Sequence, residues 1–340
     1  MKKIPVAILG ATGLVGQKFI EMLENHPYFR INELVASEKS KGKPFAEVAR
    51  PVFSDIKSQA KDIKLKGLSD GIDSKVVFSA LPSESAKTSE WELAKDGKLV
   101  ISKASANRMD RSVPLIVPEV NPEHIGMLDK QRESISGGLV CDPNCTTIIL
   151  ALTLKPLMDK FKIKRIIATS MQALSGAGHP GLASLEAMGN ILPYIPGEEE
   201  KLEMEPRKIF GKFTGSSIKM SGMEIFGSCN RVPVLNGHTL SVHIEFGERI
   251  DAEDARRELT DFVGLPNLPS GLKHPIIVRD EQDRPQPHLD ATGMAVTVGR
   301  IRRGLNSKSI AYQVVGDNLV RGAAGAGILD AELLVSKGYI

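Results

Sequence analysis

Three glycines directly after an apolar run near the N-terminus constrain the fold of this chain most strongly. The run Ile4–Leu9 predicts a buried strand, the segment GATGLVG follows it at positions 10 to 16, and a helical pattern covers Gly13–Glu24. In such a unit the first glycine permits a tight turn, the second lets the backbone approach a pyrophosphate, and the third lets helix and strand pack closely. The N–H groups at the helix start add an anion site. The segment therefore predicts a dinucleotide-binding unit, with a plain glycine-rich turn as the alternative.

The segment after the second predicted strand, Ile31–Ala36, bears on which dinucleotide binds. NAD-specific sites usually place an acid there to hold the ribose 2′-hydroxyl. Here Ser37 and Ser40 stand among three lysines, a pattern that suits a 2′-phosphate and favours NADP. Glu38 keeps the use of NAD open, and a solvated charged loop is the alternative interpretation.

Length and composition fit a two-domain protein. The chain has 340 residues, and a domain typically takes about 100–200. Its 44 Lys and Arg against 41 Asp and Glu give a net charge of +3, so no basic field exists to hold nucleic acid or anionic lipid. No apolar run predicts a transmembrane helix. The three cysteines form no disulfide framework, so we expect a reduced, cytoplasmic setting.

Short apolar strands alternate with helical stretches over the first 145 residues. This alternation predicts a parallel sheet with helices on both faces. Further strands of this sheet are expected at Val76–Ala80, Lys98–Ile101 and Leu115–Val117. The middle of the chain is predicted to be α+β, with a helix over Asp251–Val263 and longer strands at Lys164–Gln172, Thr239–Phe246, Gly293–Arg302 and Ser309–Val315, the last two antiparallel neighbours.

The last stretch, Asn318–Ser336, is expected to be helical, and glycines and alanines at 322–327 give it a thin face. Small residues let a helix pack close to another backbone, so we expect this helix to dock on the first domain. The predicted fold class is therefore α/β. A Rossmann-type dinucleotide-binding domain spans 1–145 and is completed by 316–340, and an α+β domain spans 146–315.

Cys145 is the candidate nucleophile. An Asp-Pro-Asn turn at 142–144 precedes an apolar helical run, so its thiol should lie at a helix N-terminus. There the helix and a nearby imidazolium would lower the thiol pKa from about 8.5 and make the thiolate the main form. Cys141 and Cys229 are interpreted as core thiols, and Cys145 taken alone could be one too.

Seven histidines could supply the acid or base, and their spacing does not choose among them. His26 and His124 lie in predicted loops and are expected at the surface. His238 begins a predicted strand and is one candidate of seven. No arrangement of His, Cys, Asp and Glu matches a closed zinc site, so no metal is predicted.

Several motifs along the chain occur in an order that is specific to one family. They are GATGLVGQ at the start, SALPS at 79–83, PLIVPEVN at 114–121, DPNCTT at 142–147, MQALSGAG at 171–178, NRVPVLNGHT at 230–239, RPQPHLD at 284–290, GMAVTVGRIR at 293–302 and GDNLVRGAAG at 316–325. Together they resemble the aspartate-β-semialdehyde dehydrogenases, in the branch found in archaea and fungi. The bacterial branch has an SNxSCTTN-like stretch around its cysteine, which Pro143 and Ile148 replace here.

The resemblance implies catalytic and substrate-binding roles at matching positions. Cys145 would form an acyl-thioester, His238 would be the acid/base that takes the thiol proton, and Gln172 would orient the substrate. A backbone N–H at Asn144 or Cys145 is the expected oxyanion donor. The implied substrate-binding residues are Arg231 for the carboxylate, Lys103, Asn107 and Arg108 for the phosphate, and the pair Glu198 and Lys201. Three adjacent glutamates compete for that last role, and a solvated helix face is its alternative.

The resemblance also implies cofactor-binding positions for NADP. These are Gly10, Thr12, Gly13, Leu14 and Val15 at the pyrophosphate turn, Ser37 and Ser40 at the 2′-phosphate, Ser79 and Leu81 beside the ribose, and Ser175, Gly176 and Asn318 on the nicotinamide side.

The activity that the resemblance implies is reductive dephosphorylation of 4-aspartyl phosphate to L-aspartate 4-semialdehyde, in lysine, threonine and methionine biosynthesis. The enzyme would be a cytoplasmic homodimer or homotetramer without nucleic-acid or membrane partners. One alternative is another acyl-thioester reductase on the same scaffold, such as malonyl-CoA reductase or N-acetyl-γ-glutamyl-phosphate reductase. A non-enzyme alternative is an NADP-binding sensor, against which the co-occurrence of Cys145, Gln172, Arg231 and His238 argues.

Overall fold

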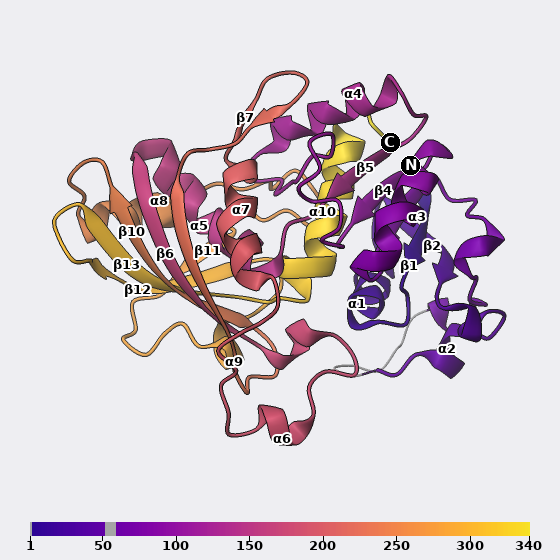
Figure 1. The fold of residues 1–340 in the computed structure, drawn as a ribbon, viewed down its shortest axis with the longest axis horizontal. Helices are drawn as coiled ribbons and strands as arrows, with labels where there is room; N and C mark the ends of the chain where they lie inside the picture. Colours follow the sequence, from indigo (N-terminus) through magenta and orange to yellow (C-terminus); the bar gives the residue numbers. More distant parts are fainter. Residues whose placement is uncertain (1, 52–58) are drawn as a thin grey trace.

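The first of the two large sheets lies at the N-terminal end of the molecule (Figure 1). The computed structural model describes residues 2–51 and 59–340. Five parallel strands in the order β2-β1-β3-β4-β5 form this sheet: β1 (Ile4–Leu9), β2 (Phe29–Val35), β3 (Val76–Ser79), β4 (Leu99–Ser102) and β5 (Gly138–Cys141). Its helices are α1 (Leu14–Leu23), α2 (Phe45–Val48), α3 (Ser83–Lys95) and α4 (Met127–Arg132). Because β3, β4 and β5 are buried at every position, they read as apolar runs without alternation.

The predicted parallel sheet is therefore confirmed, with one strand misplaced. The segment predicted as a strand at Leu115–Val117 forms only an isolated bridge, between Leu115 and Cys141. The fifth strand is Gly138–Cys141 instead, and Leu115 lies beside its end. An apolar triplet can be buried without joining a hydrogen-bonded ladder, and hydrophobicity alone does not separate the two cases.

The second sheet has six strands in the order β11-β12-β13-β10-β6-β9 and is mixed. Its strands are β6 (Ile163–Gln172), β9 (Glu224–Arg231), β10 (His238–Phe246), β11 (Ile276–Val278), β12 (Val296–Arg303) and β13 (Ser309–Gly316). The antiparallel pairing of β12 with β13 confirms the prediction. Strand β9, which pairs in parallel with β6, was not predicted, because its sequence EIFGSCNR lacks a continuous apolar run.

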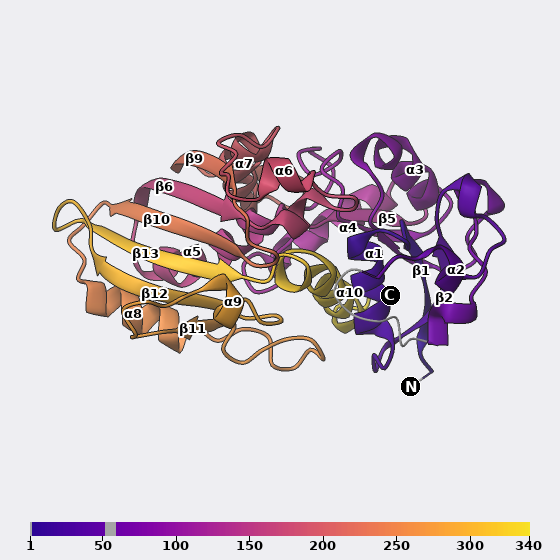
Figure 2. The ribbon, with the colours of Figure 1, turned by 90° about the horizontal axis from the view of Figure 1, so that it is seen from below.

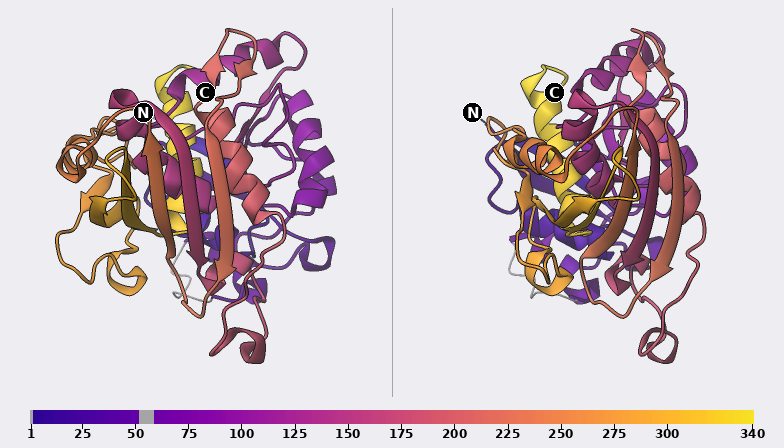
Figure 3. Two further views of the ribbon diagram at one scale, coloured as in Figure 1. Left: turned by 60° about the vertical axis from the view of Figure 1, so that its left-hand side comes forward. Right: turned by 90° about the vertical axis from the view of Figure 1, so that its left-hand side faces the viewer.

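The two faces of the second sheet differ in burial. Alternate residues of β10, such as Leu240 and Val242, are buried in the core, whereas the residues between them stay partly exposed. In Figure 3 the strands of this sheet face the viewer, with helices behind them. On the outer face, Ile167 and Phe226 are 41% and 60% exposed. The remaining elements of this half are α6 (Ser184–Ala187), α7 (Glu198–Ile209), β7 (Lys212–Phe213), β8 (Ile218–Lys219), α8 (Ala252–Asp261) and α9 (Pro287–Asp290).

In Figure 2 helix α5 (Cys145–Lys160) lies behind the strands of the second sheet, and its side chains contribute to the cores of both large sheets. Its Ile148 and Ala151 pack into the core of the first sheet, and its Ile149 and Leu150 pack into the core of the second. A helix that is apolar on all sides is expected to be buried on all sides. Because α5 contributes to both cores, the predicted boundary at residue 145 stays a prediction.

The C-terminal segment returns to the first sheet, as predicted. A π-helical turn over Val320–Ala324 leads into α10 (Gly325–Ser336), whose Ile328 and Leu329 join the core of the first sheet. A Cβ on Gly327 would lie 3.0 Å from the Phe19 ring of α1, so a small residue is needed at this crossing.

Two histidines expected at the surface are buried. His26 is 5% exposed, with Nε2 2.7 Å from Glu332 of α10, and its Nδ1 accepts the N–H of Phe29. His124 is fully buried between Asn121 and the Gly211 carbonyl. A loop position does not imply exposure when a distant segment packs over it. No helix among the described residues is long and apolar enough to cross a membrane.

Candidate active site

A cavity of about 590 Å³ opens where β1, β3, β4 and β5 end. The carboxyl ends of parallel strands are the usual ligand-binding edge of such a sheet. Several residues predicted for the site line this cavity: Gly13, Leu14, Val15, Leu81, Lys103, Arg108, Cys145, Ser175, Gly176, Lys201 and Asn318. They come from both halves of the chain, so the cavity lies between the two sheets.

The glycine turn at the start of α1 leaves no room for side chains at two positions. Gly10 has φ +71°, and a Cβ there would lie 2.5 Å from the Ala80 carbonyl oxygen. A Cβ on Gly16 would lie 2.2 Å from the Gly10 oxygen. Gly13 precedes α1 and lines the cavity. The close approach expected of a dinucleotide-binding turn is therefore present in the backbone.

Cys145 is the first residue of α5 and lines the cavity, as its sequence context predicts. Asn144 caps the helix, because its side-chain oxygen accepts the Thr146 N–H at 3.0 Å. Burial and, in smaller part, the Glu198 charge raise the pKa of the Cys145 thiol to about 12, although Arg108 opposes the rise. The expected lowered pKa is thus wrong for the free protein, because desolvation destabilises the thiolate more than the helix N-terminus stabilises it.

His238 begins β10 and is fully buried. Its Nδ1 accepts the Ala173 N–H at 3.0 Å, so the neutral ring carries its proton on Nε2. Nε2 has no hydrogen-bond partner in the described part of the chain, and a Cβ on Gly176 of the cavity wall would lie 3.0 Å from it. Burial and, in smaller part, the Arg231 charge lower the pKa of His238 to about 3. The expected imidazolium is therefore a neutral imidazole here.

Glu198, at the start of α7, faces the cysteine rather than solvent. It accepts hydrogen bonds from Asn144 Nδ2 at 3.0 Å, Lys201 Nζ at 2.8 Å and Gln172 Nε2 at 2.9 Å. Burial raises its pKa, but Lys201 and the two amides outweigh that and bring the pKa below its usual value.

The other two glutamates of this run point elsewhere. Glu199 accepts the Cys229 N–H, and Glu200 is exposed. Glu198 is therefore the member of the three that is directed toward Cys145 and its cap Asn144, and the solvated-face interpretation does not hold for it.

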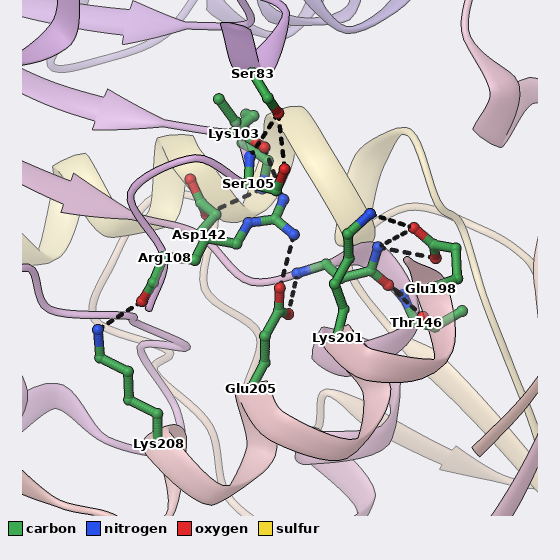
Figure 4. Close-up of polar contacts among 12 residues, drawn as sticks. Ser83, Lys103, Ser105, Arg108, Asp142, Thr146, Glu198, Lys201, Glu205 and Lys208 are labelled. Carbon is green, nitrogen blue, oxygen red and sulfur yellow. Dashed lines mark hydrogen bonds and ion pairs between the residues drawn. The ribbon is translucent and has the colours of Figure 1, made fainter. Parts of the chain in front are cut away.

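Glu205 joins two parts of the site that the sequence analysis treated separately (Figure 4). One of its oxygens accepts Arg108 Nη1 at 2.9 Å, and the other accepts the backbone N–H of Asn144 at 2.6 Å. The Asn144 N–H is thus already engaged and is not a free oxyanion donor, which leaves the Cys145 N–H. Glu205 lies seven residues after Glu198 on the same helix face, a spacing that could have identified it.

The buried Lys208 side chain binds the backbone of the segment that carries Arg108. Lys208 Nζ donates to the carbonyl oxygens of Arg108, Asp110 and Val113 at 2.5–2.7 Å. Burial lowers the pKa of Lys208 to about 8. Lys103 Nζ lies 3.2 Å from Asp142, the residue that follows β5.

Beneath Lys103 lies a second buried acid. The Asp142 carboxyl contacts Asp330 of α10, and burial raises the pKa of both carboxyls. The Asp142 charge and the contact with Asp142 raise the pKa of Asp330 as well, whereas Lys103 and the hydrogen bond with Asp330 lower the pKa of Asp142 in part.

Some residues predicted for the site do not line the cavity. Arg231 donates from Nη1 to the Ala173 carbonyl at 2.8 Å and lies behind Gly176. Asn107 is turned toward Glu90 of α3, its Nδ2 2.9 Å from a carboxylate oxygen. Gly10, Thr12, Gln172, Glu198 and His238 are not among the residues that line the cavity, Ser79 is buried at the end of β3, and Ser37 and Ser40 lie outside the cavity after the end of β2.

Comparison with known proteins identifies the family. A family model described as "Semialdehyde dehydrogenase, NAD binding domain" matches residues 5–128, and one described as "Semialdehyde dehydrogenase, dimerisation domain" matches residues 154–321. An aspartate-semialdehyde dehydrogenase of Archaeoglobus fulgidus is 46% identical over 342 residues, covering 98% of this chain and 99% of that protein. The chain belongs to the aspartate-semialdehyde dehydrogenase family. It is an oxidoreductase of this class.

Solved structures agree with this assignment. A crystal structure of aspartate semialdehyde dehydrogenase with NADP from Candida albicans superposes with a TM-score of 0.91 at 36% identity, covering 99% of this chain and 100% of that one. The family also has a relative with another name. Malonyl CoA reductase (NADP) of Metallosphaera sedula is 36% identical over 356 residues, covering 100% of this chain and 99% of that protein.

Proposed function

We propose that the chain catalyses NADP-dependent reductive dephosphorylation of 4-aspartyl phosphate to L-aspartate 4-semialdehyde, a step toward lysine, threonine and methionine. The observation that carries this proposal is the position of Cys145, at the start of α5 on the wall of a cavity next to a dinucleotide-type glycine turn. A thiol in that position can hold an acyl group while a nucleotide occupies the same cavity.

The proposed reaction proceeds through a thioester. The Cys145 sulfur attacks the acyl carbon, the S–C bond forms and the C–O bond to phosphate breaks. The thiol proton is taken by His238 and then passes to the departing phosphate. NADP, when reduced and bound, supplies the hydride that converts the thioester to a thiohemiacetal. Collapse of the thiohemiacetal releases the semialdehyde and returns the sulfur, which takes up a proton. Covalent capture divides one difficult step into two easier ones.

His238 is the proposed acid/base. Its Nε2 carries the proton and faces Gly176, so the ring can donate to a developing oxyanion from the free state. To accept the thiol proton on Nε2, the ring must first move its own proton from Nε2 to Nδ1, which in the free protein accepts the Ala173 N–H. General acid–base catalysis of this kind contributes about 10²–10⁴-fold.

The charges around the cavity suit an acyl phosphate that carries an amino acid. Arg108 Nε and Lys103 Nζ are buried without a hydrogen-bond acceptor in the described part of the chain, so both can donate to the substrate phosphate. Arg231 is proposed to bind the substrate carboxylate, and Glu198 its amino group. The cavity then pairs each charge of the substrate with an opposite one.

NADP fits the residues at the other end of the cavity. The bare backbone at Gly13 lets a pyrophosphate approach the N-terminus of α1, and Ser37 and Ser40 are proposed to hold the 2′-phosphate. Ser175 Oγ and Asn318 are hydrogen-bonded to each other on the wall near Cys145, where the nicotinamide is proposed to lie.

The decisive experiment is phosphate-dependent formation of NADPH from NADP and aspartate semialdehyde. Cys145→Ala should abolish turnover while NADP still binds in calorimetry. A Cys229→Ala variant is the matched control, because Cys229 is a buried thiol outside the cavity, and it should keep most of the activity. Retention of most turnover by Cys145→Ala would contradict the proposed mechanism.

Malonyl-CoA reduction is the second candidate, because a relative with that name is 36% identical over the full chain. Side-by-side assays with aspartyl semialdehyde, malonyl-CoA and the glutamyl analogue separate the two. The Glu198 carboxylate favours the first substrate, since only an amino acid brings a cation to it. A sensor without catalysis would show cofactor binding but no turnover with any of the three.

Assembly and location complete the proposal. The second half, residues 146–315, is proposed to form the oligomer through the outer face of its sheet, on which Ile167 and Phe226 are exposed. The description of the matching family model as a dimerisation domain supports this role. The predicted domain boundaries and the cytoplasmic setting remain part of the same proposal.

A further inference from the structure

An acidic residue stands at the position that would select against NADP. Glu38 follows β2 directly after Ser37, at the point where an acid in NAD-specific sites binds the ribose 2′-hydroxyl. A carboxylate facing that point would repel a 2′-phosphate. The proposed use of NADP therefore requires that this carboxylate be directed away from Ser37 and Ser40.

The turn that follows β2 separates the acid from the two serines. Residues 38–40 form one turn of 3₁₀-helix, in which side chains three residues apart lie on the same face. The Ser37 and Ser40 hydroxyls accordingly lie 3.3 Å apart. Glu38 lies one residue along, about 120° around the turn, on another face.

The Glu38 side chain packs against a neighbouring segment that contains Gly67 and Ser69. Residues 65–67 run alongside the end of β2, where Ala36 N–H donates to the Lys66 carbonyl at 3.0 Å. Ser69 Oγ donates to Glu38 Oε1 at 3.2 Å. Gly67 lies directly beneath the carboxylate, because a Cβ at that position would be 2.2 Å from Glu38 Oε1 and 2.6 Å from its Cδ.

We infer that Gly67 and Ser69 form a seat that holds the Glu38 carboxylate away from the 2′-phosphate site and so permit the binding of NADP. The inference rests on the proposed function only in the identity of the cofactor. Glu38 is thus an acid of the kind that NAD-specific sites use, but it is held away from the ribose. Gly67 and Ser69 determine the cofactor specificity through their contacts with it.

The charges around this seat agree with its role. Lys41 forms an ion pair with Asp70, and the pKa of Lys41 is raised first by that pair and in smaller part by Glu38. Asp70 also accepts the Gly67 N–H at 2.9 Å and so fixes the backbone beneath the carboxylate. Lys39 and Lys43 are exposed on the same loop and supply positive charge for an anion.

Gly67→Ala tests the seat without disturbing the backbone. Gly67 has φ −85°, which alanine adopts freely, and the three atoms nearest to its new methyl group would all belong to the end of the flexible Glu38 side chain. The methyl group should therefore displace the carboxylate and leave the fold intact. Ser69→Ala is the second variant and removes the hydrogen bond from an exposed residue.

The measurement is the ratio of the dissociation constants of 2′,5′-ADP and 5′-AMP, obtained by calorimetry on the full chain. We expect the wild type to prefer 2′,5′-ADP, and we expect Gly67→Ala to reduce that preference by about two- to fivefold through a like charge near the phosphate. Ser69→Ala should change it in the same direction by a smaller factor. In the Glu38→Gln background, Gly67→Ala should have no effect on the ratio.

Glu38→Gln alone separates the inference from the simplest alternative, in which the Glu38 carboxylate already repels the 2′-phosphate in the wild type. If the carboxylate is already held away, its removal should change the ratio by less than about twofold, as should the matched charge change Glu92→Gln on the exposed face of α3. The inference fails if Glu38→Gln alone raises the preference for 2′,5′-ADP as much as Gly67→Ala lowers it. It also fails if Gly67→Ala has no effect, acts equally without Glu38, or if the wild type shows no preference.

The readout involves no substrate, so it does not depend on the proposed reaction. A chain that binds 2′,5′-ADP as expected but does not turn over aspartate semialdehyde would overturn the proposed function and leave this inference standing. Steady-state kcat/KM ratios for NADP over NAD in the same variants should follow the binding ratios.

Discussion

At the scale of single residues, burial decides the charge state of the two groups proposed for the chemistry. The Cys145 thiol and the His238 imidazole are both neutral in the free protein, because each charged form would lose water that its surroundings do not replace. A neutral pair protects the thiol from oxidation and alkylation while no substrate is bound. The nucleophile is therefore expected to become reactive only when substrate charges enter the cavity.

The raised pKa of Cys145 predicts how its reactivity changes with pH. Below a pKa of about 12 the thiolate fraction rises about tenfold for each pH unit, so alkylation by iodoacetamide should accelerate steadily from pH 7 to 10. Mass spectrometry of the intact protein over time measures the rate, and Cys145→Ala supplies the background from the other two thiols. A plateau near pH 7–8 would contradict the neutral pair.

At the scale of elements, helix α7 and the start of α5 are joined by two glutamates on one face of α7. Glu198 holds the side chain of the helix cap Asn144, and Glu205 holds its backbone N–H. Glu205 also holds Arg108, so the residue proposed for phosphate and the turn before the nucleophile share one carboxylate. Glu205 thus ties the position of Arg108 to that of the turn before Cys145.

Glu205→Gln should therefore disrupt positioning more than cofactor binding. An amide can accept only one of the two hydrogen bonds that the carboxylate accepts, and its NH₂ group faces the other donor. We expect kcat/KM for the semialdehyde to fall by about 10–100-fold, a size typical of lost positioning, with the Kd of NADP little changed.

The exposed Glu200 on the same helix provides the matched control for this prediction. Glu200→Gln should keep the activity of the wild type. A Glu205→Gln variant with normal kcat/KM would show that the bridge does not position the site, and a variant with weakened NADP binding would indicate general damage instead.

At the scale of the whole molecule, the C-terminal segment closes the cavity and fastens the two halves. A Cβ on Gly322 would lie 2.5 Å from the Cβ of Cys145, so the π-helical turn packs directly on the nucleophile. One residue earlier, Arg321 is fully buried and makes a two-pronged ion pair with Glu119 at 2.7 and 2.9 Å. This pair anchors the returning segment beneath the first sheet.

Removing one partner of the Arg321–Glu119 ion pair should lower the free energy of unfolding strongly. Arg321→Met leaves a buried carboxylate without its partner, and we expect the free energy of unfolding to fall by about 3–5 kcal/mol. The double variant Arg321→Met/Glu119→Leu should lose less than this, because no buried charge is left alone. Urea denaturation of the three proteins measures both values, and equal losses in single and double variants would argue against the ion pair as the anchor.

The sequence by itself determined the local features of this protein. The strand, glycine turn and helix at the N-terminus, the parallel sheet, the return of the C-terminal helix and the position of Cys145 at a helix start all follow from neighbours within a few residues. Turn, cap and periodicity signals act over that range. They could therefore be predicted from the order of residues alone.

Only the tertiary structure decided which of three adjacent glutamates faces the cysteine, which carboxylate bridges Arg108 and Asn144, and which groups are charged. The contacts of Glu205 join residues 97 and 61 positions apart, and no local pattern encodes such pairs. The neutral states of Cys145 and His238 arise because segments far apart in sequence remove water from both. Burial depends on the whole fold, and the pKa of a buried group depends on it in turn.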